Sequence, residues 1–186
     1  MKYTTRKRID ICVTTVLVSL FIFITGCGTG ETSKIKVGLG ETIITPGENV
    51  QMRGFARSQV STGVHDDLHA RSLVIEGGDG TVVVMMTISL VTLSEEYGKR
   101  IRSGINEKTG IPENNIAISC THTHAGPNIQ RAGESYQKFL VDRSIVSAVE
   151  AWQSRVPGRI GIGSTVVMEL GRNRRRLLYD GLQPRG

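Results

Sequence analysis

Two short aliphatic runs joined by a glycine-rich turn constrain the fold of this chain more than any other feature of its sequence. Residues 70–76 and 81–88 are rich in Val, Ile, Leu and Met, and three glycines lie between them. Short runs of this kind on either side of a glycine turn are typical of a β-hairpin. Residues 82–86 are apolar without alternation, which predicts a strand covered on both faces.

Helical patterns alternate with further strand patterns along the rest of the chain. Spaced apolar residues predict helices over residues 93–109, with Ser94 as the N-cap, and over residues 137–154. The buried side of the second helix is expected to carry Phe139, Leu140, Ile145, Val149 and Trp152. Strands are expected over residues 35–39, 115–120 and 159–170, and a loop over residues 52–65. This alternation predicts an α/β fold, a layered mixed β-sheet with flanking helices.

The first 26 residues have the pattern of a bacterial lipoprotein signal. Four Lys and Arg residues precede an apolar run over residues 11–24, which is shorter than the roughly 20 residues that a membrane-spanning helix needs. Residues 24–27 resemble a lipobox, in which the Cys27 thiol receives diacylglycerol; the alternative is an ordinary signal peptide with a chance cysteine. We expect a signal peptide over residues 1–26, a tether over residues 27–34 and a folded part over residues 35–186. The protein is then extracytoplasmic and anchored to the bacterial cell membrane.

The composition of the mature chain excludes several classes of function. Without the signal, Lys and Arg fall from 23 to 19 and Asp and Glu from 17 to 16, so the formal net charge falls from +6 to +3. With this balance, and without a glycine-rich phosphate loop, we expect no nucleic-acid or nucleotide binding. Once Cys12 is removed and Cys27 lipidated, Cys120 is the one thiol left, which excludes a disulfide framework.

The four histidines fall into two tight groups. His122 and His124 follow the strand expected over residues 115–120. In an extended segment, residues two apart project from one face, so both rings could meet one metal ion or one substrate. Two imidazoles and a carboxylate suit zinc, which keeps a position for water. A hydrogen-bonded histidine pair at a strand end fits the same spacing. Cys120 falls on the same face, as a third ligand or, more commonly, as a small buried residue.

His65 and His69 form the second group. They lie four residues apart in a segment without a helical apolar pattern. The favoured interpretation is structural, with Asp66 and Asp67 binding backbone groups of a turn. The alternative is that these residues form the wall of a site.

Three segments together resemble one enzyme family. They are residues 63–71 (GVHDDLHAR), residues 115–127 (NIAISCTHTHAGP) and residues 173–175 (NRR). In order and spacing they are similar to the N-terminal catalytic domain of the neutral/alkaline non-lysosomal ceramidases, over roughly residues 35–186. The stretch THTHAGP is the specific part of the resemblance.

The resemblance implies a zinc-dependent amide hydrolase that cleaves ceramide-like N-acyl lipids. By the same resemblance, His122 is the first zinc ligand and His124 the acid/base residue that serves the leaving amine. Arg174, next to Asn173, would bind the substrate or steady the oxyanion. This set suits an amide, because its cleavage needs a strong nucleophile, a charge sink for the oxyanion and a proton for the departing nitrogen.

Members of that family are much longer, and they draw a further histidine, a glutamate and a tyrosine ligand from later in the chain. No histidine follows His124 here, whereas zinc sites use three or four protein ligands. We therefore expect an incomplete, N-terminal part of a larger catalytic domain. The alternative function is a catalytically incomplete lipoprotein that acts as a binding module or has no activity. The sequence does not fix the oligomeric state.

Overall fold

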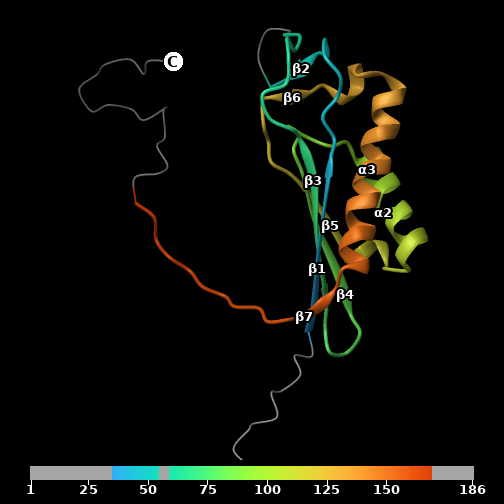
Figure 1. Cartoon of the computed structure of the whole chain (residues 1–186), viewed down its shortest axis with the longest axis vertical. Helices are drawn as coiled ribbons and strands as arrows, with labels where there is room; N and C mark the ends of the chain where they lie inside the picture. Colours follow the sequence, from blue (N-terminus) through green and yellow to red (C-terminus); the bar gives the residue numbers. More distant parts are fainter. Residues whose placement is uncertain (1–34, 55–58, 169–186) are drawn as a thin grey trace, which may run out of the picture.

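The computed structural model describes residues 35–54 and 59–168 (Figure 1). Five strands form one mixed sheet in the order β5-β4-β3-β1-β7, and β2 pairs with β6 in a second, two-stranded sheet. The elements are β1 (Ile35–Ile43), β2 (Met52–Arg53), β3 (His69–Glu76), β4 (Val82–Ile88), α2 (Glu95–Thr109), η1 (Glu113–Asn115), β5 (Ile116–Cys120), β6 (Gly126–Pro127), η2 (Ile129–Arg131), α3 (Gly133–Gln153) and β7 (Val156–Gly158).

The pairing of the strands follows from the lengths of their connections. β3 and β4 form the predicted antiparallel hairpin, and β1 pairs antiparallel with both β3 and β7. β5 runs parallel to β4, and a parallel pair needs a long crossover, which α2 supplies. The predicted α/β fold, a mixed sheet with flanking helices, is confirmed.

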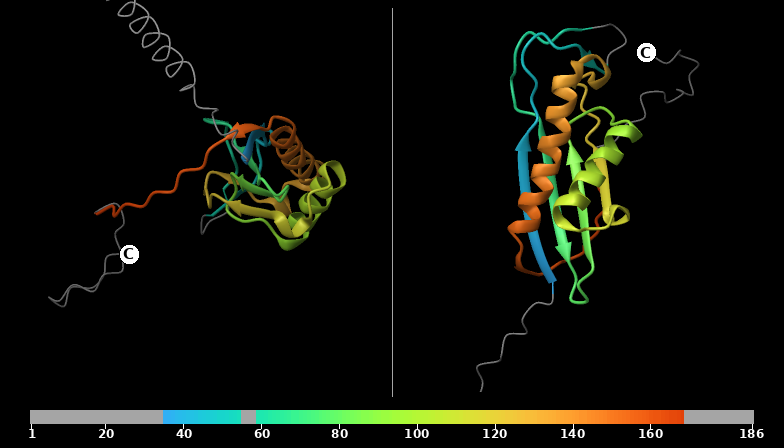
Figure 2. Two further views of the ribbon diagram at one scale, coloured as in Figure 1. Left: turned by 90° about the horizontal axis from the view of Figure 1, so that it is seen from below. Right: turned by 90° about the vertical axis from the view of Figure 1, so that its right-hand side faces the viewer.

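Both helices cover the same face of the five-stranded sheet (Figure 2). The core between the layers includes Val74, Met86, Ile101 and Leu140, all of them buried. A helix packed on a sheet hides one apolar stripe of its own and one face of the strands. Because β4 and β5 are parallel, the loops that follow them leave the sheet at the same end.

β1 and α3 approach each other unusually closely. A Cβ atom built on Gly38 would lie 1.8 Å from the carbonyl oxygen of Ala151, and one on Gly40 would lie 2.0 Å from that of Ser147. Since any larger residue would collide with helix backbone, glycine is required at both positions.

The prediction that residues 82–86 are covered on both faces was wrong. Val84 and Met86 are buried under the helices, whereas the side chains of Val83 and Met85 on the other face are 38% and 55% exposed. Successive strand residues point to opposite faces. Within the described residues, therefore, only one face of β4 is covered.

Two further expectations need correction near the end of the described chain. α3 turns mainly small side chains inward, including Ser144, Ser147, Ala148 and Ala151, while the expected core residue Phe139 is 39% exposed. The strand expected over residues 159–170 does not form within residues 159–168, which run away from the sheet (Figure 1); residues 169–170 lie outside the described part. The short strand β7 lies earlier instead, because its backbone groups pair with β1.

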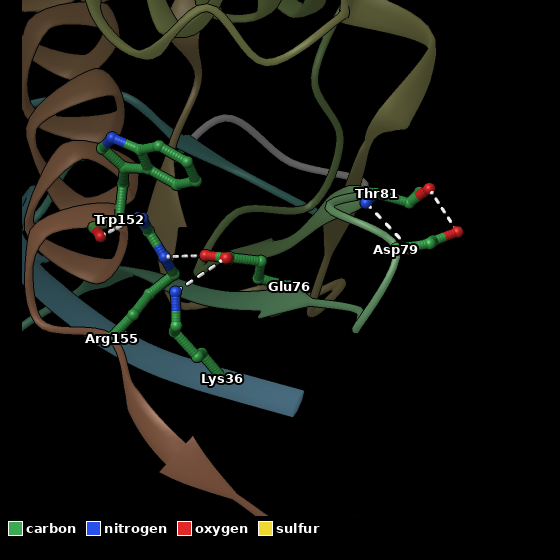
Figure 3. A network of polar contacts seen from close by, with 6 residues as sticks. All are labelled: Lys36, Glu76, Asp79, Thr81, Trp152 and Arg155. Atoms are coloured by element: carbon green, nitrogen blue, oxygen red, sulfur yellow. Dashed lines mark hydrogen bonds and ion pairs between the residues drawn. The ribbon is translucent and has the colours of Figure 1, made fainter. Parts of the chain in front are cut away.

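Ion pairs fasten the end of the sheet where the β3–β4 hairpin turns. Glu76 binds Lys36 of β1 and Arg155 after α3, each at 2.8 Å, and the Arg155 guanidinium lies over the Trp152 ring (Figure 3). The hydrogen bond from Lys36 is the main cause that lowers the pKa of Glu76, and Arg155 adds to it. This cluster joins the first strand, the hairpin and the last helix.

In the part of the chain that the structure describes, no helix has the length and apolar character required to cross a membrane.

Candidate functional site

The histidine pair lies in the loop that follows β5, at the end of the sheet opposite the Glu76 cluster. This loop follows the backbone that leaves the neighbouring strand β4. The Thr121 N–H donates to the carbonyl of Ile88 at 3.0 Å, and the His122 N–H donates to that of Leu90 at 2.9 Å. Two consecutive backbone bonds thus hold the start of the loop against a buried part of the sheet.

His122 has an uncommon backbone conformation. Its φ is 61°, in the left-handed region that a residue with a side chain enters at a cost of about 1–3 kcal/mol. Its ring Nδ1 lies 3.0 Å from the carbonyl oxygen of Val91. Because a carbonyl only accepts, Nδ1 carries the hydrogen in this contact. In the neutral ring Nε2 then has the lone pair, as in histidines that bind metals.

His124 lies beside His122 and is packed against a second loop. The centroids of the two rings are 5.2 Å apart, at an interplanar angle of 61°. The backbone of Gly54 approaches the His124 ring so closely that a Cβ there would lie 2.4 Å from its Cγ, and φ of Gly54 is 113°. Gly54 directly follows β2, which pairs with β6 just after His124. The small β2–β6 sheet thus brings Gly54 to the ring.

The two rings meet for a different reason from the expected one. The sequence predicted an extended segment with both side chains on one face, but β5 ends at Cys120 and His122 is left-handed. A turn, not strand alternation, brings His122 and His124 together. The contributions of Gly54 and of the carbonyl of Val91 were not predicted from the sequence. The only signal for either was that Gly54 lies in the polar stretch over residues 52–65.

His65 and His69 do not join this pair. His65 is exposed and its Nδ1 contacts Asp66 at 2.8 Å. His69 Nε2 lies 3.0 Å from Glu41, which also accepts a hydrogen bond from Arg71 at 3.0 Å. The Arg71 hydrogen bond is the main reason that the pKa of Glu41 is lowered. His69 therefore lies in a polar group with Glu41 and Arg71 on the sheet.

A cavity of about 340 Å³ lies next to the histidine loop. Its walls come from the loops over residues 45–52, 61–68 and 123–127, with His65 and Asp67 on one side and Thr123 and Ala125 on the other. His122 and His124 do not line this cavity, whereas Thr123 and Ala125, which alternate with them in the sequence, do. The cavity and the histidine pair thus lie on the two sides of one short loop.

Cys120 lines a different cavity, of about 360 Å³, together with Leu93 and Arg102. Burial raises the pKa of its thiol, so the thiolate that would bind a metal is disfavoured near neutral pH. In the described residues, no group of three or more His, Cys, Asp and Glu side chains could hold a metal ion. The remaining predicted site residues, Asn173, Arg174 and the lipidation residue Cys27, lie outside the described residues.

Comparison with known proteins decides the family. The family model described as neutral/alkaline non-lysosomal ceramidase, N-terminal, matches residues 35–183. The chain belongs to this ceramidase family. That match contains the whole described sheet, the histidine loop and the predicted Asn173–Arg174 pair.

Individual ceramidases agree with this assignment. The chain is 30% identical to neutral ceramidase 1 of Arabidopsis thaliana over 87% of its own length, and 30% identical to the neutral ceramidase of Pseudomonas aeruginosa over 80%. A solved ceramidase complexed with C2 shares the fold with a TM-score of 0.69 at 27% identity over 77% of this chain. The crystal structure of the Pseudomonas aeruginosa neutral ceramidase gives a TM-score of 0.63 at 26% identity over 68% of it.

This chain spans only about a quarter of these relatives. It covers 23% of the Arabidopsis ceramidase and 26% of the Pseudomonas one, and 25% and 23% of the two solved chains. The ceramidase fold of this segment is thus shared, while most of the polypeptide of the relatives has no counterpart in it.

Proposed function

We propose that this chain is the N-terminal part of a zinc-dependent hydrolase that cleaves the amide bond of ceramide-like N-acyl lipids. The observation that carries the proposal is the contact between His122 Nδ1 and the Val91 carbonyl. This contact orients the ring and leaves Nε2 as the metal-binding atom, while His124 lies beside it at 5.2 Å. The family of the chain supplies the substrate class.

The donor set fits part of a zinc site. His122 offers one oriented imidazole nitrogen, and hydrogen bonding of the other ring nitrogen to a carbonyl is the usual support for such a ligand. Two neighbouring imidazoles are fewer than the three or four protein ligands that zinc takes. The other ligands must come from outside residues 35–54 and 59–168. When bound, zinc supplies a Lewis acid that polarises the amide carbonyl and activates water.

The remaining roles belong to residues of this chain. His124 gives a proton to the departing amine, because a neutral nitrogen leaves far more readily than an amide anion. Asn173 and Arg174 hold the substrate, and the guanidinium of Arg174 offsets the charge on the oxyanion. Diacylglycerol on Cys27 keeps the enzyme at a membrane surface, where its lipid substrate is concentrated.

The experiment measures zinc affinity and release of fatty acid from a fluorescent ceramide. Because further zinc ligands are needed, it uses residues 1–183 joined to the part of the Pseudomonas aeruginosa neutral ceramidase that follows its matched segment. We expect His122→Ala to weaken zinc binding by at least about tenfold. We expect His124→Ala to keep the zinc and lose about 100-fold or more in turnover. His65→Ala is the matched control, since this exposed histidine contacts the neighbouring Asp66 and does not join the His122–His124 pair. Equal zinc affinity in His122→Ala and the parent chain would remove His122 as a ligand.

A second candidate function is a binding module without catalytic activity. It is favoured by the lack of a three-ligand cluster in the described residues. On this alternative the chain retains a ceramide-like lipid but releases no fatty acid, with or without added zinc. Lipid retention and turnover measured on the same preparation separate the two functions.

A further inference from the structure

The face of the five-stranded sheet that the helices leave open is ordered into rows by the strand register. One apolar row runs Val37–Ile75–Val83, and the next runs Leu39–Leu73–Met85–Ala117. A third row, nearer the histidine loop, is polar and runs Glu41–Arg71–Thr87–Ser119. We call the first two the open apolar rows.

The open apolar rows are exposed in this chain. Leu39 of β1 is 71% exposed and Met85 of β4 is 55% exposed, and the two belong to one row through Leu73 of β3. The polar side chains of the row beside them bond to one another, since Glu41 pairs with Arg71 at 3.0 Å and Thr87 bonds to Ser119 at 3.2 Å. A continuous apolar strip of this kind on a well-formed element marks a contact surface.

The lengths of the relatives indicate what covers this surface. In the two solved ceramidases the shared fold accounts for 25% and 23% of the chain, so three quarters of the polypeptide remains to pack somewhere. Sheets pack face to face at about 10 Å through rows of apolar side chains. A second layer of secondary structure fits two adjacent apolar rows beside a polar one.

We propose that the open apolar rows are the docking surface for the polypeptide that, in other ceramidases, lies beyond the segment matched here. The proposal rests on the family and on the strand register, and it is independent of the zinc chemistry. It concerns an apolar protein layer; a second copy of this chain and a lipid surface are the competing occupants.

The experiment compares thiol labelling in the 186-residue chain with labelling in a chimera. The chimera joins residues 1–183 to the part of the Pseudomonas aeruginosa neutral ceramidase that follows its matched segment. Leu39→Cys and Met85→Cys report on the open apolar rows. Val146→Cys is the matched control, because this apolar residue is 37% exposed on α3, in the layer that covers the other face. Peptide mass spectrometry separates each probe from the native cysteines.

We expect all three probes to react at comparable rates in the dilute 186-residue chain. In the chimera, Leu39→Cys and Met85→Cys should slow by about tenfold or more, because a buried thiol reacts only through transient opening. Val146→Cys should not slow. As a second measurement, Leu39→Glu with Met85→Glu should lower the melting midpoint of the chimera and leave that of the 186-residue chain unchanged.

Four results would overturn the proposal. Equal labelling of Leu39→Cys and Val146→Cys in the chimera, or a chimera without a cooperative thermal transition, would show that this layer does not dock there. Protection of Leu39→Cys in the 186-residue chain that disappears on dilution would assign the surface to a second copy. Protection that appears only with phosphatidylglycerol vesicles would assign it to lipid.

Discussion

The carbonyl of Val91 determines which nitrogen of His122 is available for chemistry. Without that 3.0 Å contact, either tautomer of the ring would be open, and the lone pair could point either way. The sequence identified the two histidines whose rings the structure brings together, since their spacing is visible in the chain. It could not identify Val91 or Gly54, because these act through backbone positions brought together by strand pairing.

Gly54→Ala should disturb His124 directly. The added methyl group would lie 2.4 Å from the ring, at a φ of 113° that disfavours any side chain. We expect a loss of about 1–3 kcal/mol in the free energy of unfolding, together with shifted NMR signals of the His124 imidazole.

Gly161→Ala is the control for this change, since a Cβ at that position meets nothing within 4 Å. Unshifted His124 signals in Gly54→Ala would contradict the packing of the ring on Gly54.

Tyr136 should make stability depend on alkaline pH. Its hydroxyl donates to the carbonyl of Ile44 at 2.8 Å, and burial raises its pKa well above the ordinary 10.0. The unfolded chain ionises near pH 10 while the folded one keeps its proton, so the stability contributed by Tyr136 is fully present below pH 10 and lost as the pH rises further.

The variant Tyr136→Phe isolates this effect from other groups. We expect it to cost about 1–2 kcal/mol near neutral pH, because the Ile44 carbonyl loses a buried partner. Urea unfolding between neutral pH and pH 11 should show the gap between parent and variant closing above pH 10. A gap that stays constant or widens would show that Tyr136 is not protected from ionisation.

At the scale of elements, β1 and α3 pack closely through the glycines of β1. Gly38→Ala would place a methyl group 1.8 Å from the Ala151 carbonyl oxygen. Because that atom belongs to helix backbone, the helix itself must shift. We expect a loss of about 2–4 kcal/mol in urea unfolding.

The matched substitution Gly47→Ala adds its methyl group to open space and should change stability by less than about 0.5 kcal/mol. Similar losses in the two variants would mean that the contact between β1 and α3 is looser than described.

The hairpin and both helices were predictable, and the expected core residue Leu140 of α3 is buried, but the small residues on the inward face of α3 were not predicted. Periodicity selects large apolar residues such as Phe139 for the core. The helix instead presents Ser147 and Ala151, since the glycines of β1 leave no room for larger side chains. The strand predicted near Ile162 failed because alternation alone supplies no neighbour to pair with.

At the scale of the whole molecule, the layer order followed from the alternation of helices and strands. The sequence did not show which face of β4 lies open. An unbroken apolar run is expected whatever element covers the second face of the strand. The proposed docking of a further layer on the open apolar rows would account for the apolar character of both faces of β4, because a strand covered on both faces reads as an unbroken apolar run.

The proposed lipid anchor would hold the whole molecule at a membrane, and a single-atom change at Cys27 tests it. Cys27→Ser should release the protein from membranes into the soluble fraction, because no acyl chain can be attached. Cys12→Ser makes the same change inside the signal and should leave the distribution as it was. Retention of Cys27→Ser in the membrane fraction would refute lipidation at this residue.

The first strand depends on the last helix for its place. The hydroxyl of Thr42 donates to the backbone carbonyl of Arg143, and the hydroxyl of Ser154 donates to the backbone carbonyl of Leu39, 115 residues away in the sequence. Contacts between such distant residues form late. If the chain is exported N-terminus first, the contacts between β1 and α3 can form only after α3 has emerged. Until then β1 has only β3 to pair with, and the layer formed by α3 closes over β1 last.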